Sequence, residues 1–395
     1  MRYALIIPDG AADEPIGELG NRTPLEAGRL PNINWIASHG RTGTVTHIPA
    51  NMPPGSDIAI MSLIGYDPRK NYSGRAPIEA AGQNIELAPE EWVFRANLVT
   101  IIDGKMVDFS AGHISSQEAK VLINLLAKEL AGRGVKFYPG VSYRHLVVFP
   151  DGAFSKLRTT PPHDIIGQSV QKYWPKGKSS EPLQEIMALA AALFGKHEIN
   201  EVRRQLNESP ATDLWLWGQG QRCELEPFTK RFGLGGALVA GTDLIKGLAR
   251  LVGWAVIEVP GATGYLDTDY QAKGEAAVQA LDKYDLVTVH IEAPDEAGHN
   301  GDAKAKLAAL EAIDKHIVGP VLEELRKDKH WRILICPDHP TPVRLRTHVA
   351  KPVPFALAGE NISSVLTDTF TEANAQAADL HIEQGWELME YFIKS

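Results

Sequence analysis

Short apolar runs that alternate with helical segments constrain the fold of this chain more than any other feature of its sequence. The apolar runs cover residues 3–7, 254–259, 286–291, 333–336 and 355–358. The helical segments between them include residues 243–251, 274–283 and 303–326. Alternation of this kind is typical of an α/β fold, and it predicts a mostly parallel sheet flanked by helices.

The stretch from residue 73 to residue 228 has a different pattern. Asp103 and Gly104 separate two apolar runs and predict a tight hairpin. Ser115 and Glu118 form a capping box in front of a helix with apolar periodicity. These signals predict a small α+β domain at 73–228.

The length of the chain, 395 residues, also favours two domains. We therefore expect the α+β segment to be inserted into a larger, discontinuous domain made of residues 1–72 and 229–395. The crossings between the two domains are expected near residues 66–74 and 229–236, which are rich in glycine and charged residues.

Charge and composition exclude several classes of protein. The net charge of −9 and the lack of a basic stripe argue against nucleic-acid binding. The two cysteines, Cys223 and Cys336, lie far apart, outside any metal-binding spacing, and fit a reducing compartment. The longest apolar run, residues 186–194, is too short to span a membrane, and the apolar run at the start is too short for a signal peptide. We expect a cytoplasmic protein with neither nucleic-acid nor membrane partners, and the sequence leaves its oligomeric state open.

Three of the apolar runs lead into an acidic segment. Asp9, Asp295 and Asp338 each lie within a few residues of the end of such a run. In open parallel sheets, ligands bind outside the carboxyl ends of the strands. The three carboxylates are therefore expected to converge on a site that attracts a cation.

Histidines accompany two of these carboxylates. Asp295 and His299 are four residues apart, so both reach one metal ion if that turn is helical. His339 follows Asp338 directly, and His348 lies in the next loop. Oxygen and nitrogen ligands without cysteine suit Mn²⁺, Mg²⁺ or Zn²⁺ at an open catalytic site.

Ser56 follows a loop that two prolines and a glycine make rigid, just before an expected helix. Such a loop presents the hydroxyl and free backbone N–H groups at a helix N-terminus, where phosphate is favoured. A serine needs a base or a metal ion to become a nucleophile at neutral pH. Because the Asp/His set can supply the metal, we predict that Ser56 is the nucleophile of a phosphoryl transfer.

Structural alternatives stay open for each position taken singly. Asp9 and Asp338 could be turn or cap residues, and Ser56 could be a plain N-cap. His299 could be a surface histidine, and His348 a buried one with satisfied hydrogen bonds.

Six strings of this sequence, in the same order, resemble the archaeal-type branch of the cofactor-independent phosphoglycerate mutases, within the alkaline phosphatase superfamily. They are Pro8-Asp9-Gly10, Pro53-Pro54-Gly55-Ser56-Asp57, Gly74-Arg75-Ala76-Pro77-Ile78-Glu79-Ala80, Glu292-Ala293-Pro294-Asp295-Glu296-Ala297-Gly298-His299, Pro337-Asp338-His339 and Thr347-His348. The resemblance extends to about residue 359, and the string 292–299 is its most specific part. It implies an alkaline-phosphatase-like sheet in a metal-binding domain at 1–72 and 229–395, with a substrate-binding domain at 73–228.

The resemblance also implies a reaction and its cofactors. It implies that 3-phosphoglycerate and 2-phosphoglycerate are interconverted through a phosphoserine at Ser56, as in glycolysis and gluconeogenesis, without 2,3-bisphosphoglycerate. Two divalent cations take part, Mn²⁺ or else Mg²⁺ or Zn²⁺, and they reconcile an acidic protein with an anionic substrate. By position, one ion is held by Asp9, Ser56, Asp338 and His339, and the other by Asp295, His299 and His348.

Substrate-binding residues follow from the same resemblance, and the expected partner is a small phosphorylated hydroxy acid. His113 looks like the family's substrate histidine, and Lys246 resembles a lysine that neutralises the leaving oxygen. Arg144, Arg75 and Arg158 are candidates for binding carboxylate or phosphate, which arginine does bidentately. Each of these side chains could instead be a solvated surface charge.

One segment departs from the family pattern, and two other functions stay open. After His348, where polar residues are expected, this chain has Val349-Ala350-Lys351. This leaves metal ligation intact but puts in question both the residues that support the metal ligands and the substrate. The first alternative is a metal-dependent phosphatase, or a phosphotransferase acting on another small hydroxy acid such as homoserine. The second is a non-catalytic protein with structural metal ions, which would need no reactive serine.

Overall fold

The computed structural model describes residues 1–364 and 367–395, which divide into two compact units. Met1–Tyr72 and Glu224–Ser395 form one unit, here called the sheet unit, and Ser73–Cys223 form the inserted unit. The second crossing thus lies at residues 223 and 224, a few residues before the expected position. The reason is that Phe228 already packs in the sheet unit, with its ring centroid 5.0 Å from that of Trp254.

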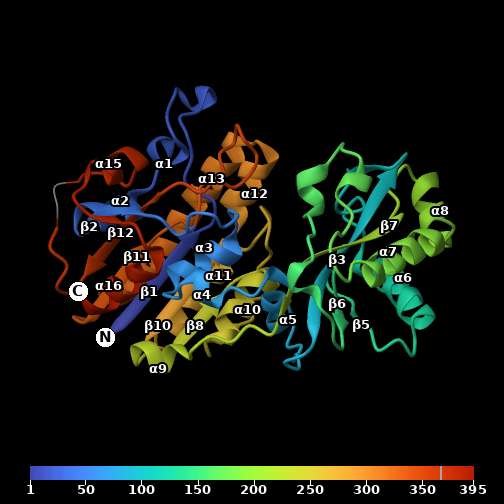
Figure 1. Ribbon diagram of the computed structural model, residues 1–395. Coiled ribbons are helices and arrows are strands. Elements are labelled where there is room, and N and C mark those ends of the chain that lie inside the picture. Colours follow the sequence, from blue (N-terminus) through green and yellow to red (C-terminus); the bar gives the residue numbers. More distant parts are fainter. Residues whose placement is uncertain (365–366) are drawn as a thin grey trace. The chain divides into compact units, whose positions relative to one another are not determined.

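An eight-stranded sheet forms the centre of the sheet unit (Figure 1). Its strands, in spatial order, are β13 (His381–Ile382), β2 (Arg41–Val45), β12 (Val353–Gly359), β11 (Trp331–Ile335), β1 (Arg2–Pro8), β10 (Leu286–Ile291), β8 (Gly236–Val239) and β9 (Ala255–Ile257). The pairings of β12 with β11 and β2 are antiparallel, and the other pairings of this sheet are parallel. The predicted α/β fold with a mostly parallel sheet is confirmed.

Helices flank this sheet. They are α1 (Pro24–Ala27), α2 (Pro31–Ser38), α3 (Ser56–Leu63), α4 (Pro68–Asn71), α9 (Phe228–Phe232), α10 (Asp243–Leu251), α11 (Tyr270–Ala280), α12 (Ala293–Asn300), α13 (Ala303–Ile313), α14 (Gly319–Leu325), α15 (Glu372–Ala377) and α16 (Leu388–Lys394). The shorter turns are η1 (Gly17–Leu19), the π-helical turn η5 (Asp314–Val318) and η6 (Gly385–Glu387). Within residues 1–364 and 367–395, no helix is both long enough and apolar enough to cross a bilayer.

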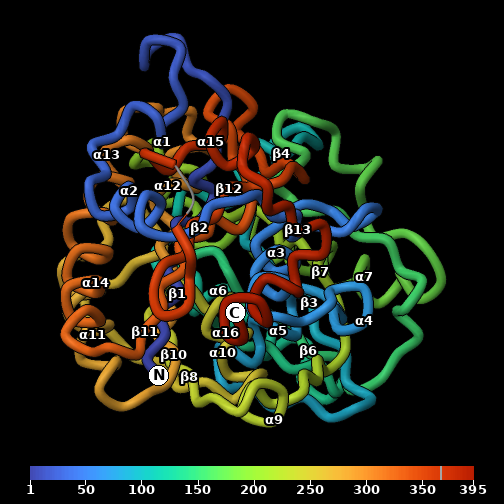
Figure 2. The backbone as a smooth tube through the Cα atoms, turned by 90° about the vertical axis from the view of Figure 1, so that its left-hand side faces the viewer, coloured from blue at the N-terminus to red at the C-terminus, as the bar shows by residue number. Residues whose placement is uncertain are grey.

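The two faces of the sheet are covered by different helices. Ala4 and Ile6 of β1 belong to a buried core that also contains residues of α2, α11, α13 and α14. Because side chains alternate along a strand, Tyr3 points to the opposite face, where its ring lies 5.5 Å from that of Phe392 in α16. The Tyr3 hydroxyl also donates to the carbonyl oxygen of Ile393, at 3.2 Å. The two ends of the chain therefore lie side by side, as Figure 1 and Figure 2 show.

The helix expected at 303–326 is interrupted by the π-helical turn between α13 and α14. Asp314 opens this turn, and its buried carboxylate accepts hydrogen bonds from the backbone N–H of Ile33 (2.7 Å) and the side-chain amide of Asn32 (2.9 Å). Ile33 lies in the first turn of α2, where backbone N–H groups lack partners within the helix. The π turn thus places a carboxylate that caps a neighbouring helix.

The inserted unit is built on an antiparallel sheet. Its strands are β4 (Lys105–Asp108), β3 (Trp92–Ile102), β6 (Arg144–Phe149) and β5 (Lys136–Tyr138) in spatial order, with β7 (Asp213–Gln221) also paired with β3. Its helices and turns are α5 (Arg75–Gly82), α6 (Ser116–Glu129), α7 (Glu181–Phe194), α8 (Glu198–Gln205), η2 (Phe154–Lys156), η3 (Pro162–Ile165) and η4 (Val170–Lys172). The predicted hairpin is confirmed, since Asp103 and Gly104 join β3 to β4 with φ of 50° and 69°. The predicted capping box of Ser115 and Glu118 is confirmed at the start of α6.

Candidate functional site

Three neighbouring strands bring the predicted metal ligands to one edge of the sheet. β1 pairs in parallel with both β10 and β11, so the carboxyl ends of these strands lie side by side. Asp9 follows β1, and Asp338 and His339 follow β11. α12 begins just after β10 and carries Asp295 and His299.

Asp9, Asp338 and His339 form the first ligand group. All three are buried, and each offers one ligand atom within 4.8 Å of the others. The Nε2 atom of His339 lies 3.3 Å from Asp338 Oδ2 and 3.6 Å from Asp9 Oδ1. The hydroxyl oxygen of Ser56 lies 3.1 Å from the same nitrogen. Four possible ligands therefore surround one small volume.

The electrostatics of this group favour a cation. Burial, together with the carboxylates of Asp338 and Asp295, raises the pKa of Asp9 well above its usual range. Burial lowers the pKa of His339 to about 4, so its ring is neutral at pH 7 and its nitrogen lone pair is available. Asp9 Oδ1 and Asp338 Oδ2 are buried, and neither has a hydrogen-bond partner among the described residues. A divalent cation such as Mn²⁺, Mg²⁺ or Zn²⁺ fits this donor set and would satisfy both oxygens.

Asp295, His299 and His348 form the second ligand group, again with ligand atoms within 4.8 Å of one another. The Nε2 atom of His299 lies 3.2 Å from Asp295 Oδ2 and 2.9 Å from His348 Nε2. Its Nδ1 atom lies 3.0 Å from the carbonyl oxygen of Arg346, an acceptor that leaves Nε2 for a metal ion. Burial would lower the pKa of His299, but the Asp295 carboxylate raises it to about 9. A metal ion that binds here must therefore displace a proton.

Thr341 joins the two groups. Its hydroxyl contacts Asp295 Oδ1 and lies 3.3 Å from His339 Nδ1. Gly10, with φ of 62°, lets the loop after β1 approach α12, since a Cβ atom there would lie 2.6 Å from Asp295 Oδ1. The rings of His339 and His348 are also adjacent, with 4.1 Å between centroids. The two groups are therefore neighbours, an arrangement typical of two-metal sites.

Ser56 is the first residue of α3, and it does not cap this helix. The N-cap position is Gly55, and no side chain caps α3, so the N-cap alternative for Ser56 is wrong. The serine is only 8% exposed, and every other residue of α3 is buried too, which holds its backbone in place. The hydroxyl is therefore free to face His339.

A histidine that the sequence analysis did not identify lies behind Asp9. His290 in β10 is fully buried, with Nε2 3.1 Å from Asp9 Oδ2 and Nδ1 3.4 Å from Glu292 Oε1. Burial would lower the pKa of His290, but the carboxylates of Glu292 and Asp9 raise it to about 10. A histidine inside a largely apolar strand, just before an acidic segment, is the sequence signal that points to it.

Lys246, the predicted partner of a leaving oxygen, lies in α10 of the sheet unit. Its Nζ atom is 2.7 Å from Glu258 Oε2. The Glu258 side chain is 66% exposed, so solvent screens this ion pair and makes it weak. The ammonium group of Lys246 can therefore leave Glu258 at little cost in free energy.

Two of the four predicted substrate-binding residues lie close to the ring of Tyr143 in the inserted unit. The ring of His113 lies 6.0 Å from that of Tyr143, and the guanidinium of Arg144 lies 5.4 Å from the same ring. Both side chains are exposed. His113 has φ of 50°, a left-handed conformation that is uncommon outside glycine and is often found at binding sites.

Arg75 belongs to a cluster built on one buried carboxylate of the inserted unit. The two oxygens of Glu79 pair with the Nε atoms of Arg75 (3.0 Å) and Arg95 (2.8 Å). Arg95, which the sequence analysis missed, lies 4.3 Å from the ring centre of Trp217. Burial alone would raise the pKa of Glu79, but Arg95, Arg75 and Arg144 lower it. Three arginines thus act on one carboxylate, and the excess positive charge suits an anion.

Arg158 does not join this cluster. Its side chain is exposed, and its backbone pairs with that of Lys176. In the part of the chain that the structure describes, no hydrogen bond or ion pair ties its side chain to the other three predicted residues.

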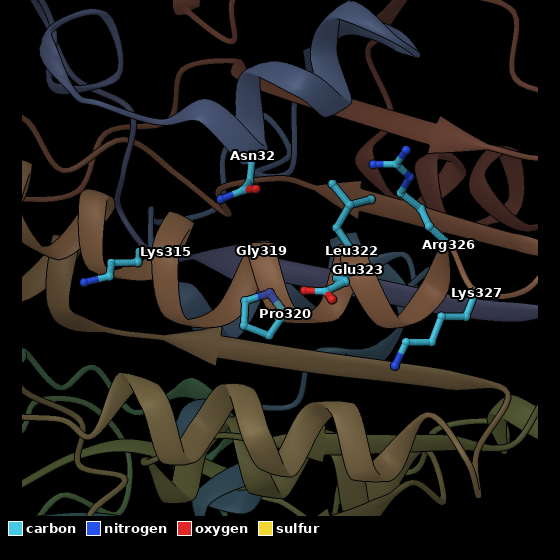
Figure 3. A pocket seen from close by; sticks show the side chains of 8 residues that line it. All are labelled: Asn32, Lys315, Gly319, Pro320, Leu322, Glu323, Arg326 and Lys327. Carbon is cyan, nitrogen blue, oxygen red and sulfur yellow. The ribbon is translucent and has the colours of Figure 1, made fainter.

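A surface hollow of about 650 Å³ lies elsewhere in the sheet unit (Figure 3). It is lined by Asn32, Lys315, Gly319, Pro320, Leu322, Glu323, Arg326 and Lys327. None of the predicted site residues is among them. The four charged residues are exposed, and the Asn32 amide already donates to Asp314, so we assign no chemistry to this hollow.

Comparison with known proteins gives consistent matches. The family described as 2,3-bisphosphoglycerate-independent phosphoglycerate mutase matches residues 37–200. A protein of that name from Methanosarcina mazei is 44% identical over 397 residues, which is 100% of both chains. A relative from Methanothermobacter thermautotrophicus, named 2,3-bisphosphoglycerate-independent phosphoglycerate mutase 2, is 45% identical and covers 99% of this chain and 96% of its own.

Two solved structures share the fold over almost the whole chain. One, a protein of Pyrococcus horikoshii, has a TM-score of 0.84 and 30% identity, and covers 99% of this chain and 96% of that one. The other, described as a cofactor-independent phosphoglycerate mutase from Thermoplasma acidophilum, has a TM-score of 0.64 and 28% identity, and covers 100% of this chain and 99% of that one.

Proposed function

Because this chain belongs to the family of 2,3-bisphosphoglycerate-independent phosphoglycerate mutases, we propose that it interconverts 3-phosphoglycerate and 2-phosphoglycerate through a phosphoserine at Ser56. It is an isomerase that works as an intramolecular phosphotransferase and needs no 2,3-bisphosphoglycerate. A phosphatase, or a transferase acting on another hydroxy acid such as homoserine, has less support, because full-length relatives carry the mutase name.

One distance supports the assignment of Ser56 as the nucleophile. The Ser56 hydroxyl oxygen lies 3.1 Å from the Nε2 atom of His339, inside the ligand group that contains Asp9 and Asp338. A buried serine hydroxyl beside metal ligands is in the environment that activates serine for attack. A purely structural metal site would not need a serine there.

The two ligand groups support an assignment of the metal ligands. We propose that one divalent cation is held by Asp9, Ser56, Asp338 and His339, and the other by Asp295, His299 and His348. Bound there, the ions would neutralise charge on the phosphoryl oxygens during transfer. We also propose that the metal is Mn²⁺, or else Mg²⁺ or Zn²⁺, and that the protein is cytoplasmic. Two free, buried cysteines support a reducing compartment.

The reaction consists of two phosphoryl transfers that balance without another reactant. In the first, Ser56 Oγ loses its proton and bonds to phosphorus, while the bond from phosphorus to the O3 atom of 3-phosphoglycerate breaks and O3 takes up a proton. In the second, the hydroxyl oxygen at C2 loses its proton and bonds to phosphorus, and Ser56 Oγ leaves and regains a proton. Lys246 is the residue proposed to stabilise and protonate O3.

Glycerate must stay bound between the two transfers, or water will take the phosphoryl group. Groups held in place reach effective molarities of about 10⁵ M or more. We propose that His113, Arg144 and Arg75 hold the glycerate carboxylate and hydroxyls, and the excess positive charge around Glu79 supports this. Arg158 stays a candidate with less support, because its side chain lies apart from the cluster.

³¹P NMR tests the proposal directly. Metal-loaded protein and 3-phosphoglycerate, without nucleotide or 2,3-bisphosphoglycerate, should reach an equilibrium mixture of the two phosphoglycerates. If inorganic phosphate is instead the main product, the protein is a phosphatase. If neither product forms, but homoserine is phosphorylated when a nucleotide is added, the transferase function is the right one.

A further inference from the structure

A fully buried histidine lies between two carboxylates directly behind the proposed metal ligand Asp9. His290 pairs with Ile7 of β1 in the sheet, two residues before Asp9. Its side chain is 0% exposed, and its Nε2 atom lies 3.1 Å from Asp9 Oδ2. Its other ring nitrogen, Nδ1, lies 3.4 Å from Glu292 Oε1. Both nitrogens of the ring therefore face a carboxylate.

Glu292 is itself held from the other side. The fully buried ammonium of Lys273 lies 3.9 Å from Glu292 Oε2, and it donates to the backbone carbonyl oxygen of His290 at 3.2 Å. Turning the His290 ring would move both ring nitrogens away from these two carboxylates and leave buried polar atoms without polar neighbours, which is costly in a protein interior. The two carboxylates therefore favour the observed orientation of the ring.

The two carboxylate oxygens of Asp9 have different neighbours. Oδ2 faces His290, whereas Oδ1 lies 3.6 Å from the Nε2 atom of His339. Oδ1 has no hydrogen-bond partner among the described residues. Turning the Asp9 carboxylate would take Oδ1 away from Asp338 and His339.

Stability alone does not account for a buried histidine between two carboxylates at this place. Well-packed apolar side chains of similar volume are often at least as stable as a buried ion network. Groups behind metal ligands typically orient those ligands and set the metal affinity. We propose that His290 is a positioning residue that, held by Glu292, keeps Asp9 Oδ1 directed into the cation site with Asp338 and His339. The proposal rests on the metal ligands of the proposed function.

Metal binding by the protein without substrate tests this inference. Mn²⁺ is titrated into chelator-treated wild type and His290→Leu, followed by calorimetry and by electron paramagnetic resonance. We expect one ion to bind about 10–100-fold more weakly in the variant and the ion at Asp295 to bind as in wild type. With Co²⁺ as the probe, the visible spectrum of the weakened site should change, because it reports ligand geometry. A residue that serves stability alone would leave that spectrum unchanged.

Two further variants sharpen the test. His145→Leu is a matched control, since His145 is a buried strand histidine of the inserted unit whose Nδ1 accepts from the N–H of Gly140. It should leave both Mn²⁺ affinities unchanged. Glu292→Gln should weaken the same ion as His290→Leu. In the double variant the loss should be smaller than the product of the two separate losses, because Glu292 acts through His290.

Wild-type affinity for both ions in folded His290→Leu would overturn the proposal, and so would independent effects of His290 and Glu292 in the double variant. If His290→Leu does not fold, Glu292→Gln decides, because wild-type binding in that variant also contradicts the proposal. No readout involves phosphoglycerate. A protein that bound metal as expected but made no 2-phosphoglycerate would therefore contradict only the proposed function. An active mutase with unchanged metal binding in the variants would contradict only this inference.

Discussion

Lys306 and Asp13, 293 residues apart in the sequence, form a fully buried ion pair with 2.7 Å between Nζ and Oδ2. The same ammonium donates to the carbonyl oxygen of Thr341 at 2.9 Å. One lysine of α13 thereby ties the loop after β1, which carries Asp9, to the loop after β11, which carries Asp338. The relative position of these two ligand loops depends on a side chain that belongs to neither.

Lys306→Met should destabilise the protein strongly, because it leaves the Asp13 carboxylate buried without its partner. Breaking a buried ion pair from one side costs about 3–5 kcal/mol of unfolding free energy. Urea unfolding followed by circular dichroism measures this loss. Lys304→Met is the matched control, since Lys304 is an exposed lysine of the same helix, and its effect should stay within about 0.5 kcal/mol. Equal stability of the two variants would contradict the prediction.

Ser56→Ala should abolish the interconversion of the phosphoglycerates while the fold stays intact, because only the attacking oxygen is lost. We expect a fall in kcat of about 10⁴-fold or more. Acid quenching with ³²P-labelled 3-phosphoglycerate should label the peptide that contains Ser56 in wild type and not in the variant. Ser62→Ala is the control, because Ser62 is a buried serine of the same helix whose hydroxyl has no partner among the described residues. Substantial turnover by Ser56→Ala would mean that another residue is the nucleophile.

Chelation of divalent metal should lower the stability of the protein. Burial and the neighbouring carboxylates of Asp338 and Asp295 raise the pKa of Asp9, and a bound cation relieves that repulsion. With Mn²⁺ at about 100 times its Kd, each occupied site adds about 2.7 kcal/mol to the unfolding free energy. Thermal unfolding with and without EDTA measures the gain, which should be smaller in Asp295→Asn. An unchanged Tm on adding Mn²⁺ would rule out binding at these groups.

Arg144→Ala should make the protein more like a phosphatase. Glycerate held less firmly allows water to compete for the phosphoserine. Loss of one charge-assisted hydrogen bond, about 1.5–3 kcal/mol, should lower the rate of isomerisation about 10–100-fold. The ratio of inorganic phosphate to 2-phosphoglycerate should rise in Arg144→Ala and in His113→Ala. Arg133→Ala is the control, since this exposed arginine of the inserted unit pairs only with the exposed Glu185 among the described residues. The same ratio in all variants would show that these side chains do not hold glycerate.

Glu79→Gln should destabilise the protein near neutral pH but not in acid. Burial raises the pKa of Glu79, but Arg95 and Arg75 outweigh it and hold the pKa below its ordinary value of 4.5. The carboxylate therefore contributes stability above the unfolded-state pKa, and this contribution is lost as the pH falls through the folded-state pKa. Urea unfolding at a series of pH values should show the largest difference between wild type and variant at about pH 7. A difference that persists at about pH 2 would contradict this account.

The features that could be predicted from the sequence depend on neighbours in the chain. The capping hydroxyl of Ser115 and its partner Glu118 are three residues apart, and Asp103 and Gly104 form the hairpin turn by themselves. Asp295 could be nominated as a ligand because it follows an apolar run, and the carboxyl ends of parallel strands meet at one edge. Local pattern and a general rule of sheet topology are enough for such predictions.

The sequence by itself determined five strands of the larger sheet and the acidic and histidine residues that follow three of them, but not β2, β8 or β13. Only the tertiary structure revealed that His290 meets Asp9, that Lys306 meets Asp13, and that Arg95 turns toward Glu79. In the sequence, His290 is one polar residue within an apolar strand, and Lys306 is one lysine within a helix. Whether such a group is a solvated charge or a buried partner depends on its desolvation and on its distance to an opposite charge. Both quantities are set by strands and loops that the folded chain brings together from distant positions, and neither is contained in the local pattern.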